Sequence, residues 1–305
     1  MNHKSKKIKL RYGENPNQNS YLLSYSNNSI LKYQISGKKI SYNNLIDVDS
    51  GLKCLKEFHE PTSIILKHTN PCGVASAKNI ELAFSKSYQS DPISAFGGIV
   101  LLNRRVSYKL AKKIFKNFYE MIVASDYDQA ALKILEKKKN LILLKMPNIK
   151  KIHIEYKSTL FGDLFQTTDL TPINKKFIRL VSKKRGSVKS INDLIFSLKV
   201  VKHLKSNAIV LSRNKQTLGL GLGQTNRVDA LKTAIKNMNK YFRKGFFVCA
   251  SDGFFPFTDN IKILNKNGCH VVVQPSGSIN DKRVVAFSIK NKISLYFSKN
   301  RLFKH

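Results

Sequence analysis

The stretch that decides the fold is residues 63–102, which read SIILKHTNPCGVASAKNIELAFSKSYQSDPISAFGGIVLL. Two short apolar runs, 63–66 and 98–102, bound it, and an amphipathic segment, 80–88, lies between them. Short apolar runs rich in Ile and Val predict buried strands, whereas apolar side chains recurring every three to four residues predict a helix. The stretch therefore predicts a strand, a helix and a second strand, the unit from which α/β folds are built.

The same alternation continues through the rest of the chain, apart from a less regular segment at 147–185. Further strands are predicted at 121–124, 141–144, 208–211, 247–250, 271–273 and 293–297. Further helices are predicted at 108–118, 128–136, 191–204, 228–238, 260–265 and 281–289. The pattern predicts an α/β protein with two domains, 1–160 and 161–305, although no repeat is visible among the residues themselves.

Composition limits the cellular setting. The chain has 305 residues, of which 42% are hydrophobic, so it can bury a globular core. Its four cysteines include no CxxC pair, which disfavours a disulfide framework or a zinc ribbon. No apolar run approaches the roughly 18 residues that a membrane span requires. We therefore expect a cytoplasmic protein without a membrane segment.

The formal charge of +35 raises the alternative of a nucleic-acid-binding protein, because basic surfaces release counterions from phosphates. Lys supplies 44 of the 54 basic residues, whereas base-specific contacts commonly use Arg. The lysines are also spread over nearly every segment. This distribution favours a general surface character over a nucleic-acid site, with attraction of anionic substrates as a consequence.

The segment 67–73, KHTNPCG, follows the first predicted strand and is interpreted as a loop at the carboxyl end of that strand, where parallel sheets bind ligands. His68 has a side chain that can accept a proton near neutral pH, and the ammonium of Lys67 can stabilise negative charge on an acyl oxygen. A structural loop histidine beside a surface lysine is the alternative for this dipeptide taken alone.

Other predicted loops carry weaker signals. The segment 218–224, LGLGLGQ, has glycines spaced GxGxG rather than GxGxxG, and it is interpreted as a turn. Arg227 follows at a predicted helix start, where an anion is favoured. The segment 251–259 places three aromatic residues beside two carboxylates, a set that suits a flat heterocycle. Arg301, near the end of the chain, is a candidate phosphate ligand if the tail docks.

Together these segments resemble the transformylase half of the bifunctional purine biosynthesis family, phosphoribosylaminoimidazolecarboxamide formyltransferase / IMP cyclohydrolase. The matching motifs are LRYGENP (10–16), SYNN (41–44), KHTNPCG (67–73), ISAFGG (93–98), KSNA (205–208), GLGQ (221–224), FFPF (254–257), QPSGS (274–278) and RLFKH (301–305). The resemblance implies two cytidine-deaminase-like α/β/α domains and a homodimer with active sites at the subunit interface. It also implies formyl transfer from 10-formyltetrahydrofolate, the co-substrate, to the amine of 5-aminoimidazole-4-carboxamide ribonucleotide (AICAR).

The resemblance assigns roles residue by residue. His68 would be the general base, Lys67 would stabilise the transition state, and Asn44 would lie in the reacting centre. The ribotide would be bound by Arg11, Tyr12, Gly97, Glu120, Asn207, Arg227, Phe254 and Arg301. The folate would be lined by Val228, Asp259, Ser278 and Ile279.

Two alternatives to this function stay open, and one activity of the family is not expected. A zinc deaminase with a similar fold needs a PCxxC motif, but here Pro71-Cys72 is followed by Ala75 at the second cysteine position, so no zinc is expected. A non-catalytic homologue or a basic RNA-binding scaffold is the second alternative. IMP cyclohydrolase activity is not expected, because the matching motifs belong to the transformylase half.

Overall fold

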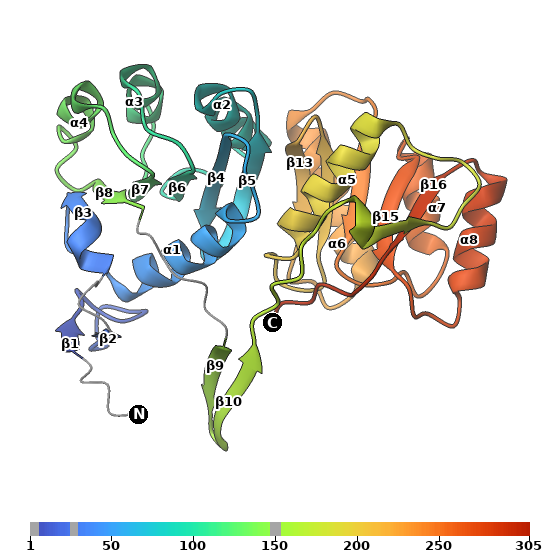
Figure 1. The fold of residues 1–305 in the computed structure, drawn as a ribbon, viewed down its shortest axis with the longest axis horizontal. Helices are drawn as coiled ribbons and strands as arrows, with labels where there is room; N and C mark the ends of the chain where they lie inside the picture. Colours follow the sequence, from blue (N-terminus) through green and yellow to red (C-terminus); the bar gives the residue numbers. More distant parts are fainter. Residues whose placement is uncertain (1–5, 25–29, 147–153) are drawn as a thin grey trace.

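The structure, a computed structural model, describes residues 6–24, 30–146 and 154–305 (Figure 1). Its first half places one helix before a β-hairpin and then alternates helices with strands. The elements are β3 (Gln34–Ser36), α1 (Tyr42–Leu55), β4 (Thr62–Lys67), β5 (Asn70–Ser76), α2 (Ile80–Ser90), β6 (Ile99–Leu102), α3 (Tyr108–Phe115), β7 (Met121–Ala124), α4 (Gln129–Leu135) and β8 (Ile142–Lys145). Before them lie the paired strands β1 (Lys6–Lys9) and β2 (Tyr21–Ser24) and the 3-10 helix η1 (Ile30–Tyr33).

The second half has the same sequence of elements. They are β11 (Ile178–Leu180), α5 (Val188–Val201), β12 (Ile209–Arg213), β13 (Gln216–Gly221), α6 (Arg227–Tyr241), β14 (Val248–Ser251), α7 (Asp259–Lys266), β15 (Val271–Pro275), α8 (Asp281–Lys290) and β16 (Ser294–Ser298). A hairpin of β9 (Ile154–Thr159) and β10 (Gly162–Thr167), followed by the 3-10 helix η2 (Lys175–Phe177), connects the halves.

Within the described residues, twelve strands form one mixed sheet in the order β11-β16-β15-β14-β12-β13-β5-β4-β6-β7-β8-β3. The order reads the same outward from the middle in each half, and every corresponding pair of strands is parallel or antiparallel alike. The chain is therefore an internal duplication in topology, which its residues do not reveal. The α/β prediction is confirmed.

The two halves meet where β5 pairs with β13, at Ala75 and Gln216. Thr217 strengthens this seam, because its hydroxyl accepts from the backbone N–H of Val74 at 3.0 Å. Its carbonyl accepts from the hydroxyl of Ser90 at 2.7 Å. One apolar core runs under α1 and α5 on one face of the sheet and includes residues of both halves. On the other face, α2 to α4 and α6 to α8 cover two separate cores.

The glycine-rich segment at 218–224 is mainly strand, so the prediction of a turn was wrong. A Cβ on Gly219 would lie 2.0 Å from the carbonyl oxygen of Ala234, and one on Gly221 would lie 1.8 Å from that of Ala230. Both carbonyls belong to α6, so these glycines let the helix pack directly on the strand. Gly73 in β5 has the same relation to α2, where its Cβ would lie 2.0 Å from the carbonyl oxygen of Ser87.

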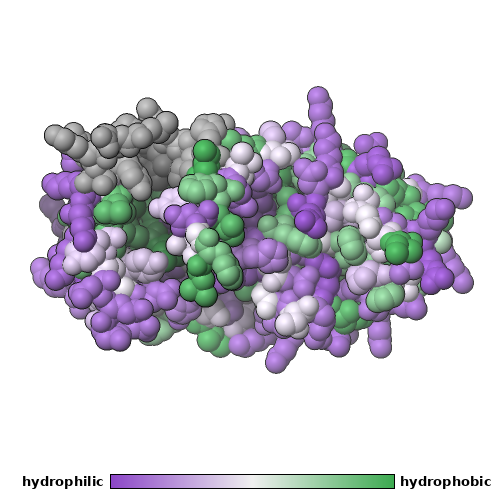
Figure 2. All heavy atoms as spheres, turned by 90° about the horizontal axis from the view of Figure 1, so that it is seen from below, coloured by the Kyte–Doolittle hydropathy of each residue, from purple (hydrophilic) through white to green (hydrophobic). Residues whose placement is uncertain are grey.

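The region 147–185 contains regular structure that the sequence did not predict, and its first residues, 147–153, lie outside the described part. The proposed boundary between residues 160 and 161 falls in the turn of the β9–β10 hairpin. Figure 1 shows this hairpin projecting away from the sheet. Figure 2 views the molecule from that side, where apolar atoms lie among mostly hydrophilic ones. The exposed apolar residues of the hairpin are Ile154, Tyr156, Leu160, Phe161, Leu164 and Phe165.

No helix among the described residues combines the length and the apolar composition that crossing a bilayer requires.

Candidate functional site

The predicted base His68 lies in a tight turn rather than in a long loop. Lys67 ends β4 and Asn70 begins β5, so only His68 and Thr69 separate the two strands. Both turn residues have positive φ, 53° and 64°, which is the conformation of the two-residue turns that match the twist of a hairpin. The interpretation of 67–73 as a loop is therefore corrected: the hairpin fixes the backbone on both sides of the imidazole.

Helix α1 holds this turn from one side. The carboxylate of Asp47 accepts from the backbone N–H of Thr69 at 2.6 Å, and the hydroxyl of Ser50 donates to the Thr69 carbonyl at 2.8 Å. Burial raises the pKa of Asp47, while the Thr69 hydrogen bond and the neighbouring His68 act in the opposite direction. Both polar groups of the Thr69 backbone, its N–H and its carbonyl, are thus hydrogen-bonded to α1.

Asn44 lies one turn before Asp47 on the same helix and is buried. Its side-chain oxygen accepts from the backbone N–H of Ser41 at 3.0 Å, and the Ser41 hydroxyl accepts from the backbone N–H of Asn44 at 3.3 Å. This reciprocal pair is a capping box that starts α1. Asn44 therefore has a structural role whether or not it also contributes to the reacting centre.

Lys67 points toward the segment before β6. Its Nζ donates to the carbonyl of Phe96 at 2.9 Å, and a Cβ on Gly97 would lie 3.9 Å from that Nζ. Gly97 has a φ of 73° and donates its backbone N–H to the carbonyl of Phe118. A side chain at this position would therefore contact both the Phe118 ring and the ammonium, in a backbone conformation that other residues adopt with strain.

Arg11, Tyr12 and Glu120 form a second part of this group. Arg11 donates to the Tyr12 hydroxyl at 2.9 Å, and its Nη2 lies 3.7 Å from the Glu120 carboxylate. Lys38 makes a closer contact with Glu120, at 2.7 Å. The Nε of Arg11 is buried without a hydrogen-bond partner among the described residues. An anionic ligand would satisfy that donor.

These residues occupy an unexpected edge of the sheet. Because β4 runs antiparallel to β6, its carboxyl end lies beside the amino ends of β6 and β7, where Gly97 and Glu120 are found. The His68 turn does follow the carboxyl end of β4, as predicted, but β4 is antiparallel to β6 rather than part of a parallel pair. In the second half Phe254 and Asp259 follow the carboxyl end of β14, Ser278 and Ile279 that of β15, and Arg301 that of β16. Asn207 instead precedes β12, and Arg227 and Val228 follow the antiparallel strand β13.

Arg227 is the centre of the second group. Its Nη2 donates to Asn207 at 2.6 Å and to Asp252 at 2.9 Å, and its Nη1 donates to the carbonyl of Phe254 at 3.1 Å. Asp252 is fully buried. The Nε of Arg227 and one carboxylate oxygen of Asp252 have no partner among the described residues. The guanidinium is thus held in a fixed orientation with a donor still unused.

The C-terminal tail docks onto this group. The backbone N–H of Leu302 donates to the carbonyl of Asp252 at 2.8 Å, and the Leu302 side chain is buried. The guanidinium of Arg301 lies 5.0 Å from the ring centroid of Phe303, and that of Arg227 lies 5.9 Å from it. The structure therefore brings Arg301 and Arg227 to one ring.

The candidate folate residues lie next to this group. Val228 follows Arg227 in α6, and Asp259 begins α7. The remaining candidates, Ser278 and Ile279, lie in the loop after β15. Asn280 connects that loop to the loop after β14, because its side-chain amide donates to the carbonyl of Pro256 at 2.8 Å. Ile279, beside Ser278, is completely exposed. These residues share one side of the second half, but no described hydrogen bond joins them to His68.

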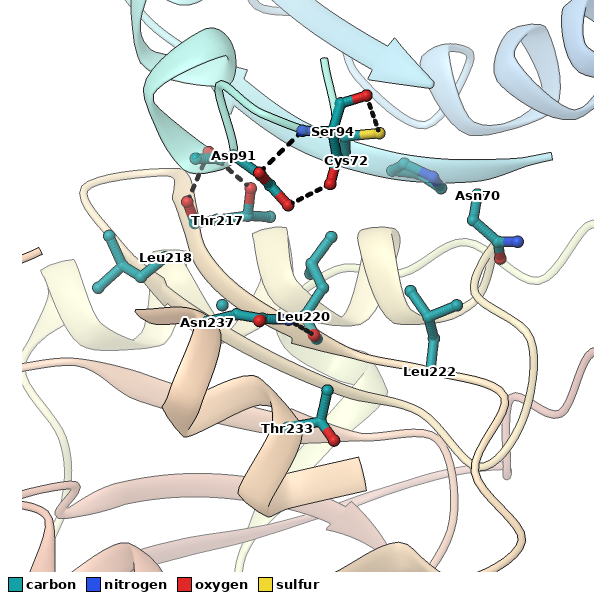
Figure 3. A pocket seen from close by; sticks show the side chains of 13 residues that line it. Asn70, Cys72, Asp91, Ser94, Thr217, Leu218, Leu220, Leu222, Thr233 and Asn237 are labelled. Atoms are coloured by element: carbon teal, nitrogen blue, oxygen red, sulfur yellow. Dashed lines mark hydrogen bonds between the residues drawn. The ribbon is translucent and has the colours of Figure 1, made fainter. Parts of the chain in front are cut away.

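A cavity of about 230 Å³ lies at the seam between the halves. Figure 3 shows Asp91, Ser94 and Cys72 from the first half facing Leu220 and Asn237 from the second. Burial raises the pKa of the Cys72 thiol to about 12, so it is a poor nucleophile. In the described residues no group of three His, Cys, Asp or Glu side chains has the arrangement of a metal site.

A buried histidine beside the tail makes stability depend on pH. Burial lowers the pKa of His203, and the nearby carboxylate of Glu57, 3.5 Å away, offsets this only in part. Below about pH 6.5 the unfolded chain therefore binds a proton more readily than the folded one.

We expect the free energy of unfolding to fall from pH 7.5 to pH 5.5, by at most about 1.4 kcal/mol per pH unit for this one proton. The His203→Gln variant should show a shallower fall. Urea unfolding at both pH values measures the difference. Equal pH dependence in the two proteins would rule out His203 as the cause.

The family model described as "AICARFT/IMPCHase bienzyme" matches residues 1–237. The chain belongs to this family. The bifunctional purine biosynthesis protein PurH of Caldicellulosiruptor saccharolyticus is 44% identical over 305 residues, covering 97% of this chain and 59% of the relative. PurH of Buchnera aphidicola subsp. Baizongia pistaciae is 45% identical over 310 residues, covering 98% of this chain and 58% of the relative.

The chain thus spans somewhat less than two thirds of these AICARFT/IMPCHase relatives. Several residues that contact the candidate residues or their backbone were not predicted, namely Lys38, Asp47, Ser50 and Asp252. Asp252 lies in the loop that was singled out, so its carboxylate was a visible signal. The others act through contacts with distant segments and had no local signal.

Proposed function

We propose that this chain transfers a formyl group from 10-formyltetrahydrofolate to the 5-amine of AICAR, giving formyl-AICAR and tetrahydrofolate in purine (IMP) biosynthesis. The observation that carries the proposal is the Lys67-His68 pair, with the imidazole on a rigid hairpin turn and the ammonium beside Gly97. Family membership supports the same reaction.

The chemistry explains why a base and a cation are both required. The amine of AICAR is conjugated with its imidazole ring, so it becomes an effective nucleophile only as His68 takes its proton. Attack on the formyl carbon forms the new C–N bond and places negative charge on the formyl oxygen, which Lys67 stabilises. The bond to the folate nitrogen then breaks, and that nitrogen receives a proton.

The remaining residues bind the two substrates. Arg227 and Arg301 would hold the phosphate of the ribotide, because guanidinium groups suit phosphate oxygens and the Nε of Arg227 is a donor without a partner among the described residues. The ribotide site would be completed by Asn207, Phe254, Arg11, Tyr12, Gly97 and Glu120. Val228, Asp259, Ser278 and Ile279 line the folate, and the exposed side chain of Ile279 gives its rings an apolar surface.

The proposal includes the wider organisation of the protein. Each half would be a cytidine-deaminase-like α/β/α domain, 1–160 and 161–305, and the duplicated topology supports two halves on either side of the β9–β10 hairpin. The active protein would be a homodimer in the cytoplasm, with active sites at the subunit interface. This would bring residues from different copies together. The reaction would proceed without zinc, and the cyclohydrolase step would not be performed by these residues.

The test is direct incubation of the purified protein with AICAR and 10-formyltetrahydrofolate. We expect tetrahydrofolate to appear only when AICAR is present, together with a ribotide whose mass has increased by one formyl group in place of one hydrogen. The omission of AICAR is the control for spontaneous deformylation. A lack of turnover, combined with tight RNA binding that weakens steeply with salt, would instead favour the basic scaffold.

A further inference from the structure

We propose that Lys304 is a positioning residue for His68, acting from the C-terminal tail through Ser50 and the backbone of Thr69. This inference rests on the function proposed above, in which His68 is the base. It concerns a residue that contacts neither the imidazole nor the folate residues among the described contacts. Its effect would therefore reach the reaction only through the turn.

The contacts form a continuous path. The Nζ of Lys304 donates to the hydroxyl of Ser50 at 3.1 Å and to the carbonyl of His203 at 3.2 Å. The Ser50 hydroxyl donates its single proton to the carbonyl of Thr69 at 2.8 Å. Because the Ser50 hydroxyl donates to Thr69, it must accept from Lys304. The positive charge of Lys304 then strengthens the hydrogen bond from Ser50 to Thr69.

The turn needs such support because of its backbone. His68 and Thr69 both have positive φ, a conformation that costs a residue other than glycine free energy unless its surroundings hold it. Asp47 fixes the N–H of Thr69, and Ser50 fixes its carbonyl. If the Thr69 carbonyl were released from Ser50, the peptide plane between Thr69 and Asn70 would be free to rotate. The short turn would then change its conformation, and the imidazole of His68 would move with it.

The other end of the path is equally well fixed. The carbonyl of Lys304 accepts from the backbone N–H of Ser206 at 2.9 Å, and its own N–H donates to the Ser206 hydroxyl at 3.2 Å. Two residues earlier, Leu302 is bound to Asp252, which holds Arg227. The tail segment 302–304 thus connects Arg227, the proposed phosphate-binding residue, with His68, the proposed base.

The position of the ammonium argues for this role over that of a surface charge. Burial lowers the pKa of Lys304, so its charged form is costly unless polar groups compensate for the lost water. The compensation comes from the two oxygens already named. A methionine would fill the same space without a donor, so Lys304→Met removes the hydrogen bonds while keeping most of the packing.

The experiment measures kcat and the KM values of both substrates for four variants. We expect Lys304→Met and Ser50→Ala each to lower kcat about tenfold while both KM values change less than about twofold, because a misplaced base slows chemistry more than binding. The double variant should be no slower than the slower single variant, since both changes break one path. Lys299→Met, an exposed lysine of the same tail, should keep the kcat of the unaltered protein.

A second readout is independent of turnover. The NMR signals of the His68 imidazole, assigned by their loss in His68→Ala, should shift in Lys304→Met and stay in place in Lys299→Met. If the unaltered protein is inactive but these signals shift, the proposed function fails and the positioning role stands. If kcat and the His68 signals are both unchanged in folded Lys304→Met and Ser50→Ala, the positioning role is wrong.

Discussion

The His68→Ala variant should lose at least about 100-fold of its kcat for formyl transfer, because general base catalysis typically contributes that much or more. Alanine leaves the turn backbone with its hydrogen bonds to Asp47 and Ser50, which involve the backbone of Thr69 rather than the imidazole. The loss would therefore report the missing base rather than a rearranged hairpin.

Ribotide affinity should change much less. The proposed phosphate contacts come from Arg227 and Arg301, which belong to the second half and share no described hydrogen bond with His68. Calorimetric titration with AICAR should give a Kd within about threefold of the unaltered protein, since a group acting only in the transition state contributes little to binding. The exposed His59, changed to alanine, is the matched control. Unchanged turnover in His68→Ala would remove this residue from the mechanism.

The sequence predicted those strands whose residues are buried on both faces of the sheet and therefore form a continuous apolar run. The strand β7 at Met121–Ala124 is fully buried, and its apolar run gave the same bounds in the sequence. Strand β13 was not predicted, because its burial depends on how closely a helix packs on it. Its glycines serve the packing of α6 on the strand, and a glycine needed for close approach cannot be distinguished by sequence from one needed for a turn.

Helix α1 was also missed, although it carries the predicted residue Asn44. Its start is a capping box in which Asn replaces the usual Glu or Gln, and its apolar face is interrupted by Asn44, Asp47 and Ser50. Those interruptions are the residues that hold the His68 turn and cap the helix. The polar character that hid the helix is thus a consequence of its position beside the candidate site.

The candidate site itself was predictable only for side chains whose chemistry is unusual in a loop. Lys67, His68 and Arg227 could be singled out in this way. Lys304 looked like one more lysine among many in a chain of net charge +35. The role proposed for it depends on a hydrogen bond to a helix 254 residues earlier in the chain, which no local pattern encodes.

The second large effect is expected for stability, in the Asp252→Ala variant. Asp252 is fully buried, and the side chain of Arg227 is only 9% exposed. Removal of the carboxylate leaves a buried guanidinium without its counter-charge, and breaking a buried pair in this way costs about 3–5 kcal/mol. We expect the free energy of unfolding, measured in urea, to fall by that amount.

The comparison with two other variants separates charge from packing. Asp252→Asn keeps the shape and one acceptor oxygen for Arg227, so it should destabilise the protein less than Asp252→Ala. Asp229→Ala removes a half-exposed carboxylate from the same helix as Arg227, where its pair with Lys232 spans 3.5 Å, and should cost no more than about 1 kcal/mol. If Asp252→Ala were as mild as Asp229→Ala, Arg227 would not depend on a buried counter-charge. The guanidinium would then be free to turn toward solvent, and the phosphate contact proposed for Arg227 and Arg301 would lose the fixed orientation on which it depends.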